Sequence, residues 1–91
     1  MSVLARIKAA IKEGRYETSE HADEEAEKDD FLPEDVEHAL LHGQLVRRFT
    51  RDPRGTRYEI VGPATDGRQL AVICRIKTTG KLLLITTYLV E

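Results

Sequence analysis

The chain has 91 residues, of which 41% are hydrophobic and 33% are charged, a composition typical of one small globular domain. A chain of this length buries about 60–65% of the surface that it exposes when unfolded, which leaves room for one core and a shallow site and excludes a multidomain enzyme. Since we find neither a run of about 18 apolar residues that could cross a membrane nor a secretory leader, we expect a cytoplasmic protein.

The small net charge of −2 conceals an uneven distribution along the chain. Residues 17–38 hold eleven acids against Lys28, whereas residues 39–81 hold nine bases against three acids. The basic second half would attract phosphate groups, and the acidic segment would oppose that attraction. The acids are most simply the outer face of two helices; alternatively, they dock a basic partner or mask the basic sheet.

The N-terminal part of the chain has the apolar spacing and the capping residues of helices. Ser2 is placed to cap a first helix, and Gly14 is placed to end it. The inner face of this helix would carry Val3, Leu4, Ile7 and Ile11. Thr18 or Ser19 can cap a second helix, which runs to about residue 29.

The second helix is dense in acids and has only a narrow apolar stripe, formed by Ala22 and Ala26. Pro33 stands at the first position of a third helix, because proline is well tolerated there. Gly43 is placed to stop that helix. Its inward side would carry Val36, Ala39 and Leu40.

From residue 44 the apolar period becomes two-fold, which is typical of strands. Four strands are expected, at residues 45–50, 56–61, 69–76 and 82–89. Turn chemistry separates them, at Asp52-Pro53-Arg54-Gly55, Thr65-Asp66-Gly67 and Thr79-Gly80. Because such short links cannot return a chain to lie parallel, we expect an α+β fold in a single domain over residues 1–91: a four-stranded antiparallel meander with two to three N-terminal helices packed on one face.

Hairpin loops fix which residues share a face of the sheet. A two-residue Thr79-Gly80 loop gives a core face with Leu70, Val72, Cys74, Ile76, Leu83, Ile85 and Leu89. The opposite face then carries Ala71, Ile73, Arg75, Leu84, Thr86 and Tyr88. A three-residue loop ending at Gly67 adds Tyr58 and Ile60 to the core face and sets Arg57 opposite Arg75.

The face opposite the core is a candidate anion-binding surface, with Arg57, Arg75, Thr86 and Tyr88 on it. The first strand adds either Arg47 or Arg48, since its apolar alternation permits both choices. An ordinary wet sheet face would also carry Arg and Thr. Arg57 and Arg75 would place like charges directly across a strand pair, which is unfavourable unless Glu59 or a bound anion compensates them. This pairing therefore favours an anion-binding surface over an ordinary wet face.

The histidines and the cysteine give weaker indications. His21 lies in the first turn of the second helix and can exchange protons near neutral pH, so it is a candidate general base or acid. Glu34, His38 and His42 recur at a spacing that can hold zinc, but without a fourth ligand a solvated face is the better interpretation, and we expect no metal site. Cys74 alternates with core residues and is expected to be an inert buried thiol.

Several short pieces, in order, resemble a bacterial family of unknown function, the one numbered 4258, over about residues 15–90. They are Tyr16-Glu17-Thr18-Ser19-Glu20-His21-Ala22, Leu32-Pro33-Glu34-Asp35-Val36-Glu37-His38-Ala39-Leu40, Gly43, Asp52-Pro53-Arg54-Gly55, Asp66-Gly67-Arg68 and Ile85-Thr86-Thr87-Tyr88. The resemblance implies the fold of the barnase, EndoU, colicin and RelE-type ribonucleases, which occur among toxins of toxin–antitoxin systems. It also implies cofactor-free, metal-independent cleavage of RNA through a 2′,3′-cyclic phosphate, with RNA and an antitoxin-like protein as partners.

Carried over by position, the resemblance implies catalytic roles for four residues: His21 as the base, Arg75 for the phosphate charge, and Thr86 and Tyr88 for orientation. Arg57 and Arg47 or Arg48 would bind substrate. The sequence departs from the family pattern where arginines often follow the histidine, since acids stand there, and where Ala71 replaces a strand histidine. A non-catalytic protein- or nucleic-acid-binding module of the same fold is the alternative.

Overall fold

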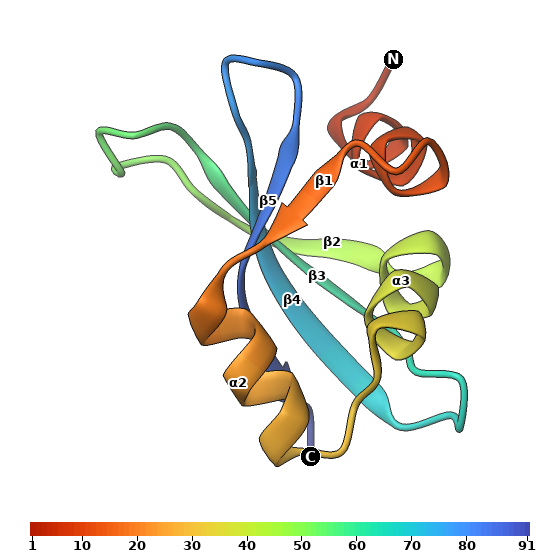
Figure 1. Cartoon of the computed structure of the whole chain (residues 1–91). Coiled ribbons are helices and arrows are strands. Elements are labelled where there is room, and N and C mark those ends of the chain that lie inside the picture. Colours follow the sequence, from red (N-terminus) through yellow and green to blue (C-terminus); the bar gives the residue numbers. More distant parts are fainter.

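The computed structural model describes residues 1–91 and contains three helices and one five-stranded sheet. In chain order the elements are α1 (Val3–Lys12), β1 (Tyr16–Thr18), α2 (Glu20–Lys28), α3 (Pro33–His42), β2 (Gln44–Phe49), β3 (Arg57–Pro63), β4 (Gln69–Ile76) and β5 (Leu82–Leu89). The strands lie in the order β1-β5-β4-β3-β2 (Figure 1). The α+β class and the antiparallel meander of the last four strands are therefore as the sequence predicts.

The helices begin and end where their capping residues predict. Ser2 Oγ accepts a hydrogen bond from the backbone N–H of Ala5 at the start of α1. Ser19 Oγ does the same for Ala22 at the start of α2. Pro33 is the first residue of α3, and Gly43 follows its last turn. None of these helices is long and apolar enough to span a bilayer.

The expected number of strands is wrong, because β1 adds a fifth. β1 pairs in parallel with β5, with Tyr16 opposite Leu82 and Thr18 opposite Leu84, so it lies along the edge of the sheet (Figure 1). The backbone hydrogen bond from Ser19 N–H to the Leu84 carbonyl extends this pairing. A three-residue strand is too short to show an alternating pattern, and the intervening helices and meander give the chain the length that a parallel return requires.

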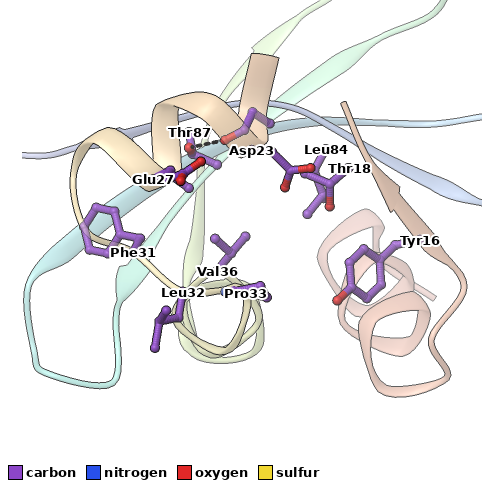
Figure 2. Close-up of a pocket in the computed structure, with 12 residues that line it drawn as sticks. Tyr16, Thr18, Asp23, Glu27, Phe31, Leu32, Pro33, Val36, Leu84 and Thr87 are labelled. Atoms are coloured by element: carbon purple, nitrogen blue, oxygen red, sulfur yellow. Dashed lines mark hydrogen bonds between the residues drawn. The ribbon is translucent and has the colours of Figure 1, made fainter. Parts of the chain in front are cut away.

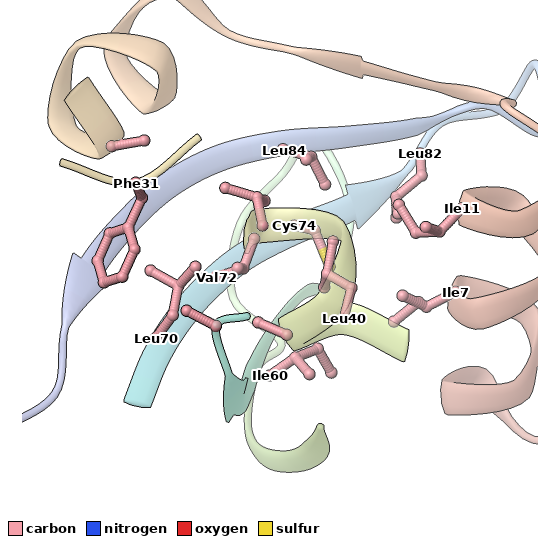
Figure 3. Close-up of a cluster of buried hydrophobic side chains, with 14 of the residues drawn as sticks. Ile7, Ile11, Phe31, Leu40, Ile60, Leu70, Val72, Cys74, Leu82 and Leu84 are labelled. Carbon is pink, nitrogen blue, oxygen red and sulfur yellow. The ribbon is translucent and has the colours of Figure 1, made fainter. Parts of the chain in front are cut away.

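All three helices share one core with one face of the sheet. Figure 3 shows helix residues Ile7, Ile11 and Leu40 packed against strand side chains. The strand side chains of this core are Ile60, Leu70, Val72, Cys74, Leu82 and Leu84. Cys74 is fully buried among them, and burial raises the pKa of its thiol to about 12.

The register of β5 differs from the expected one at its first half. Lys77 and Lys81 enclose a three-residue loop, with the N–H of Lys77 donating to the carbonyl of Lys81 at 2.8 Å, so the expected two-residue loop is wrong. Leu82 and Leu84 therefore face the core in place of Leu83 and Ile85. A bulge at Ile85 then restores the expected pairs, in which Thr86 lies opposite Ile73 and Tyr88 opposite Ala71.

The β3–β4 hairpin loop holds two helix ends together. Asp35, near the start of α3, is buried, and its carboxylate accepts hydrogen bonds from the Leu32 N–H at 2.8 Å and from the N–H and hydroxyl of Thr65. Arg68 donates to the carbonyls of Asp29 and Asp30 at the end of α2. The loop thereby fixes the distance between α2 and α3.

Candidate functional site

The face of the sheet opposite the helices is uncovered, and we call it the open face. Its side chains include Arg47 and Phe49 from β2, Arg57 and Glu59 from β3, Ala71, Ile73 and Arg75 from β4, and Leu83, Thr86 and Tyr88 from β5. A bulge at Val46 settles the ambiguity in β2, because Arg47 pairs with Glu59 and Phe49 with Arg57. Arg48 pairs with Tyr58 and is placed on the other side of the strand.

Glu59 stands at the centre of the open face and is only 5% exposed. Its carboxylate accepts a hydrogen bond from the Tyr88 hydroxyl at 2.5 Å and lies 3.6 Å from Nε of Arg47. The hydrogen bond to the carboxylate, together with partial burial, raises the pKa of the Tyr88 phenol. Tyr88 is therefore a neutral donor at physiological pH, held in place by an acid.

Arg57 is partly neutralised within the protein. Its Nε lies 3.3 Å from a carboxylate oxygen of Asp52, without a geometry that makes a hydrogen bond, and is itself buried. The guanidinium stacks over the Phe49 ring, 4.9 Å from the ring centroid. Hydrogen bonds from the backbone and the side chain of Arg54 hold the pKa of Asp52 below its ordinary value, so this counter-charge persists into acid.

Arg75 is the unpaired cation of the open face. It makes no hydrogen bond and no salt bridge, and its side chain is half-buried. The β2–β3 loop covers its aliphatic part, since a Cβ added at Gly55 would lie 3.3 Å from Cδ of Arg75. The guanidinium of Arg75 thus has no carboxylate within salt-bridge distance, in contrast to that of Arg57, which lies near Asp52.

A groove of about 510 Å³ adjoins the open face at the β2–β3 loop. It is lined by four arginines, Arg48, Arg51, Arg54 and Arg57, with Phe49 and Asp52 among them. Arg48 and Arg51 have no carboxylate within salt-bridge distance. Arg48, which the sequence assigns to substrate binding, therefore lies next to the open face and not on it.

The structure brings together some of the residues singled out in the sequence and not others. Arg75, Arg57, Arg47, Thr86 and Tyr88 share the open face. His21 does not share it, because it lies in the first turn of α2, whose buried residues Ala22 and Ala26 pack on the other side of the sheet. The His21 side chain is exposed and has no hydrogen-bonding or ionic partner among the others.

His38 and His42 of α3 are the histidines whose spacing in the sequence can hold zinc. His38 lies beside His42, with ring centroids 4.4 Å apart, and its Nδ1 is 2.7 Å from the carbonyl oxygen of Pro63. No group of three or more side chains has a geometry that could hold a metal ion. The sequence places Glu59 beside the arginines only as a compensating charge and not as a site residue. It is the only acid in the four expected strands, which was a usable signal.

Comparison with known proteins gives one match. The family model described as "Domain of unknown function (DUF4258)" matches residues 18–89. No curated protein and no solved structure matches the chain.

Proposed function

Since the chain belongs to the DUF4258 family, whose description assigns no activity, we propose that it is a toxin-like, metal-independent endoribonuclease that binds and cleaves RNA on the open face. The observation that carries this proposal is the unpartnered guanidinium of Arg75, which shares an uncovered surface with a buried carboxylate, Glu59, and a neutral phenol, Tyr88. An acid–base reaction needs a proton acceptor near the phosphate-binding cation, and Glu59 is the carboxylate that this face supplies.

The proposed reaction is an intramolecular transfer at phosphorus. A ribose 2′-oxygen attacks the adjacent phosphorus, the bond to the 5′-oxygen breaks, and the products are a 2′,3′-cyclic phosphate and a free 5′-hydroxyl. A base takes the 2′ proton, and the leaving 5′-oxygen takes a proton from solvent water. Arg75, aided by Arg57, neutralises the charge that develops on the phosphoryl oxygens, which is the largest contribution such a site supplies.

Glu59 is the base that best suits this surface. It lies on the same face as Arg75, whereas His21, which the resemblance favours, lies on the helix side. A substrate 2′-hydroxyl would take the place of the Tyr88 hydroxyl on the carboxylate, and the freed phenol would then orient the scissile phosphate. Thr86, on the same strand as Tyr88, offers a second hydroxyl for that purpose.

The test is single-turnover cleavage of a fluorescent RNA in the presence of EDTA, by the wild type and by Arg75→Ala, Glu59→Gln and His21→Ala. We expect Arg75→Ala and Glu59→Gln to lower the rate by about 10²–10⁴ and His21→Ala to leave it unchanged. Mass spectrometry should identify the cyclic phosphate, and circular dichroism should show that each variant is folded. Equal rates in the wild type, Arg75→Ala and Glu59→Gln would refute the proposal.

The second candidate is a non-catalytic nucleic-acid-binding module that uses the same face. The engagement of Glu59 by Arg47 and Tyr88 favours it, because a carboxylate committed to two partners is a poor base. This candidate predicts RNA binding without turnover and no growth arrest on expression. It also predicts that Arg75→Ala lowers the slope of log affinity against log salt concentration by about one. A toxin predicts arrest that an antitoxin-like protein relieves.

A further inference from the structure

The helix side of the molecule has a groove of its own, separated from the open face by the sheet. It lies between α2 and α3 and has a volume of about 660 Å³, within the range of sites that enclose a ligand. Figure 2 shows Val36, Leu84 and Thr87 between the two helices, with Tyr16 at one end and Phe31 at the other. The inner surface is therefore mainly apolar. Because Asp23 and Glu27 also line the site, we call it the acidic groove.

Two free carboxylates form the rim on the α2 side. Asp23 and Glu27 line the groove one helical turn apart, and both are exposed. Neither side chain makes a hydrogen bond or a salt bridge. Two like charges at this spacing destabilise a helix, and no lysine or arginine lines the groove to compensate them.

The opposite rim is apolar and exposed. Leu32, which precedes α3, is 59% exposed, and with Pro33 it lines the groove across from α2. The groove thus presents an apolar floor between a negative rim and an apolar rim. An amphipathic helix with basic residues on one flank matches that arrangement, because residues four apart on a helix repeat at the spacing of Asp23 and Glu27.

We propose that the acidic groove binds a basic amphipathic helix of a partner protein, with an apolar side chain on its floor and lysine or arginine residues on Asp23 and Glu27. Charge complementarity selects this occupant: residues 17–38 carry eleven acids and one base. A second copy of the chain does not fit. Its basic helix α1 has the apolar residues Ile7, Ala10 and Ile11 buried in its own core, and most of its other bases lie on the sheet face and the adjoining loop. The proposal is independent of any nuclease activity, which concerns the other side of the sheet.

The experiment uses the full chain and a fluorescein-labelled synthetic helix of about 14 residues, with leucines along one face and lysines along the other. Binding is followed by fluorescence anisotropy at about 0.1 M salt. Two control peptides replace the lysines with glutamates or the leucines with serines. We expect saturable binding of the first peptide and none of either control.

Two double variants of α2 provide a matched comparison. Asp23→Lys/Glu27→Lys reverses the rim, whereas Glu20→Lys/Glu24→Lys makes the same change in charge, at the same spacing, on residues that do not line the groove. Each pair includes one acid of the first helical turn. We expect the first variant to lose about tenfold or more in affinity and the second to change it by less than about twofold.

Leu32→Ser tests the apolar rim without risk to the fold, since serine is a better residue than leucine before a helix. It should weaken peptide binding while thermal unfolding is unchanged or shifts upward. Equal losses of affinity in the two double variants, or equal affinity for the serine-substituted peptide, would overturn the proposal. Either result would mean that the acidic segment attracts the peptide by its net charge alone. A concentration-dependent dimer of the wild type that Asp23→Lys/Glu27→Lys abolishes would also overturn it, because the occupant would then be a second copy.

Discussion

Replacing Asp35 with alanine should lower the free energy of unfolding substantially, because this carboxylate joins α3 to the β3–β4 loop. It is 5% exposed and accepts three hydrogen bonds, from Leu32 N–H, Thr65 N–H and the Thr65 hydroxyl. Hydrogen bonds to a charged group contribute about 1.5–3 kcal/mol each, and the cost of burying the charge offsets part of the sum. We expect Asp35→Ala to lose about 2–4 kcal/mol of unfolding free energy at pH 7.

The loss should depend on pH in a defined direction. The hydrogen bond from the Thr65 hydroxyl, followed by that from the Leu32 N–H, holds the pKa of Asp35 below its ordinary value. The folded state therefore favours the ionised carboxylate, and the stabilisation is complete above the pKa of the unfolded chain, about 3.9. It disappears as the pH falls through the lower pKa of the folded state, so the wild type and Asp35→Ala should converge in acid.

The assay is urea unfolding followed by circular dichroism, at pH 7 and at several values below pH 4. Asp66→Ala is the matched control, because Asp66 lies in the same loop and also has a lowered pKa but pairs with Arg68 at the surface. It should lose much less stability than Asp35→Ala. A loss of less than about 0.5 kcal/mol in Asp35→Ala at pH 7, or an equal loss at pH 7 and in acid, would refute the reasoning.

Three other outcomes follow from particular contacts. Gly62→Ala should lower the free energy of unfolding by about 1–3 kcal/mol in a denaturant titration, because the added Cβ would lie 2.2 Å from the carbonyl oxygen of Ala39; near-wild-type stability would contradict this. Cys74, with its pKa raised to about 12 by burial, should react with a disulfide reagent at least about a hundredfold more slowly than free thiols until denaturant is added. Burial and the hydrogen bond to Glu37 raise the pKa of Tyr16 to about 12. The stability that the neutral phenol contributes is therefore present below about pH 10 and is lost between about pH 10 and 12. The free energy of unfolding of Tyr16→Phe should fall less than that of the wild type over this interval.

The helices could be predicted because their signals are local. Ser2, Ser19, Pro33 and Gly43 act within one turn of the helix end that each defines. β1 could not be predicted, since its three residues are held by β5, more than sixty residues later in the chain. The hydrogen bonds of Asp35 could not be predicted for the same reason, because its partner Thr65 lies 30 residues later in the chain, in the β3–β4 loop.

The arginine-bearing face could be predicted from alternation, but its details depended on two bulges. The three-residue loop before β5 moved Leu84 into the core, and the bulge at Ile85 returned Thr86 and Tyr88 to the open face. In β2 the bulge at Val46 selected Arg47 and not Arg48 as the partner of Glu59. Bulges leave no clear mark on the hydrophobic pattern, so the pairing of Glu59 with Tyr88 and Arg47 could not be read from it. His21 was predicted at the start of a helix, and packing the helices on the core face already implied that this helix lies across the sheet from the arginine-bearing face.

The sheet separates two surfaces of opposite charge, and this arrangement connects the two proposed ligands. The acids of α2 and the arginines of the open face lie on opposite sides of one layer of strands, about 10 Å from strand to packed element. Because the charged side chains extend outward from both layers, they lie farther apart than the screening length of about 8 Å at physiological ionic strength, so the acids weaken the attraction of the open face for phosphate appreciably only in dilute salt. A basic helix in the acidic groove would cancel part of that opposing field and strengthen the binding of a polyanion on the other side. By linkage the polyanion would strengthen the binding of the helix to the same degree, and added salt would weaken this coupling.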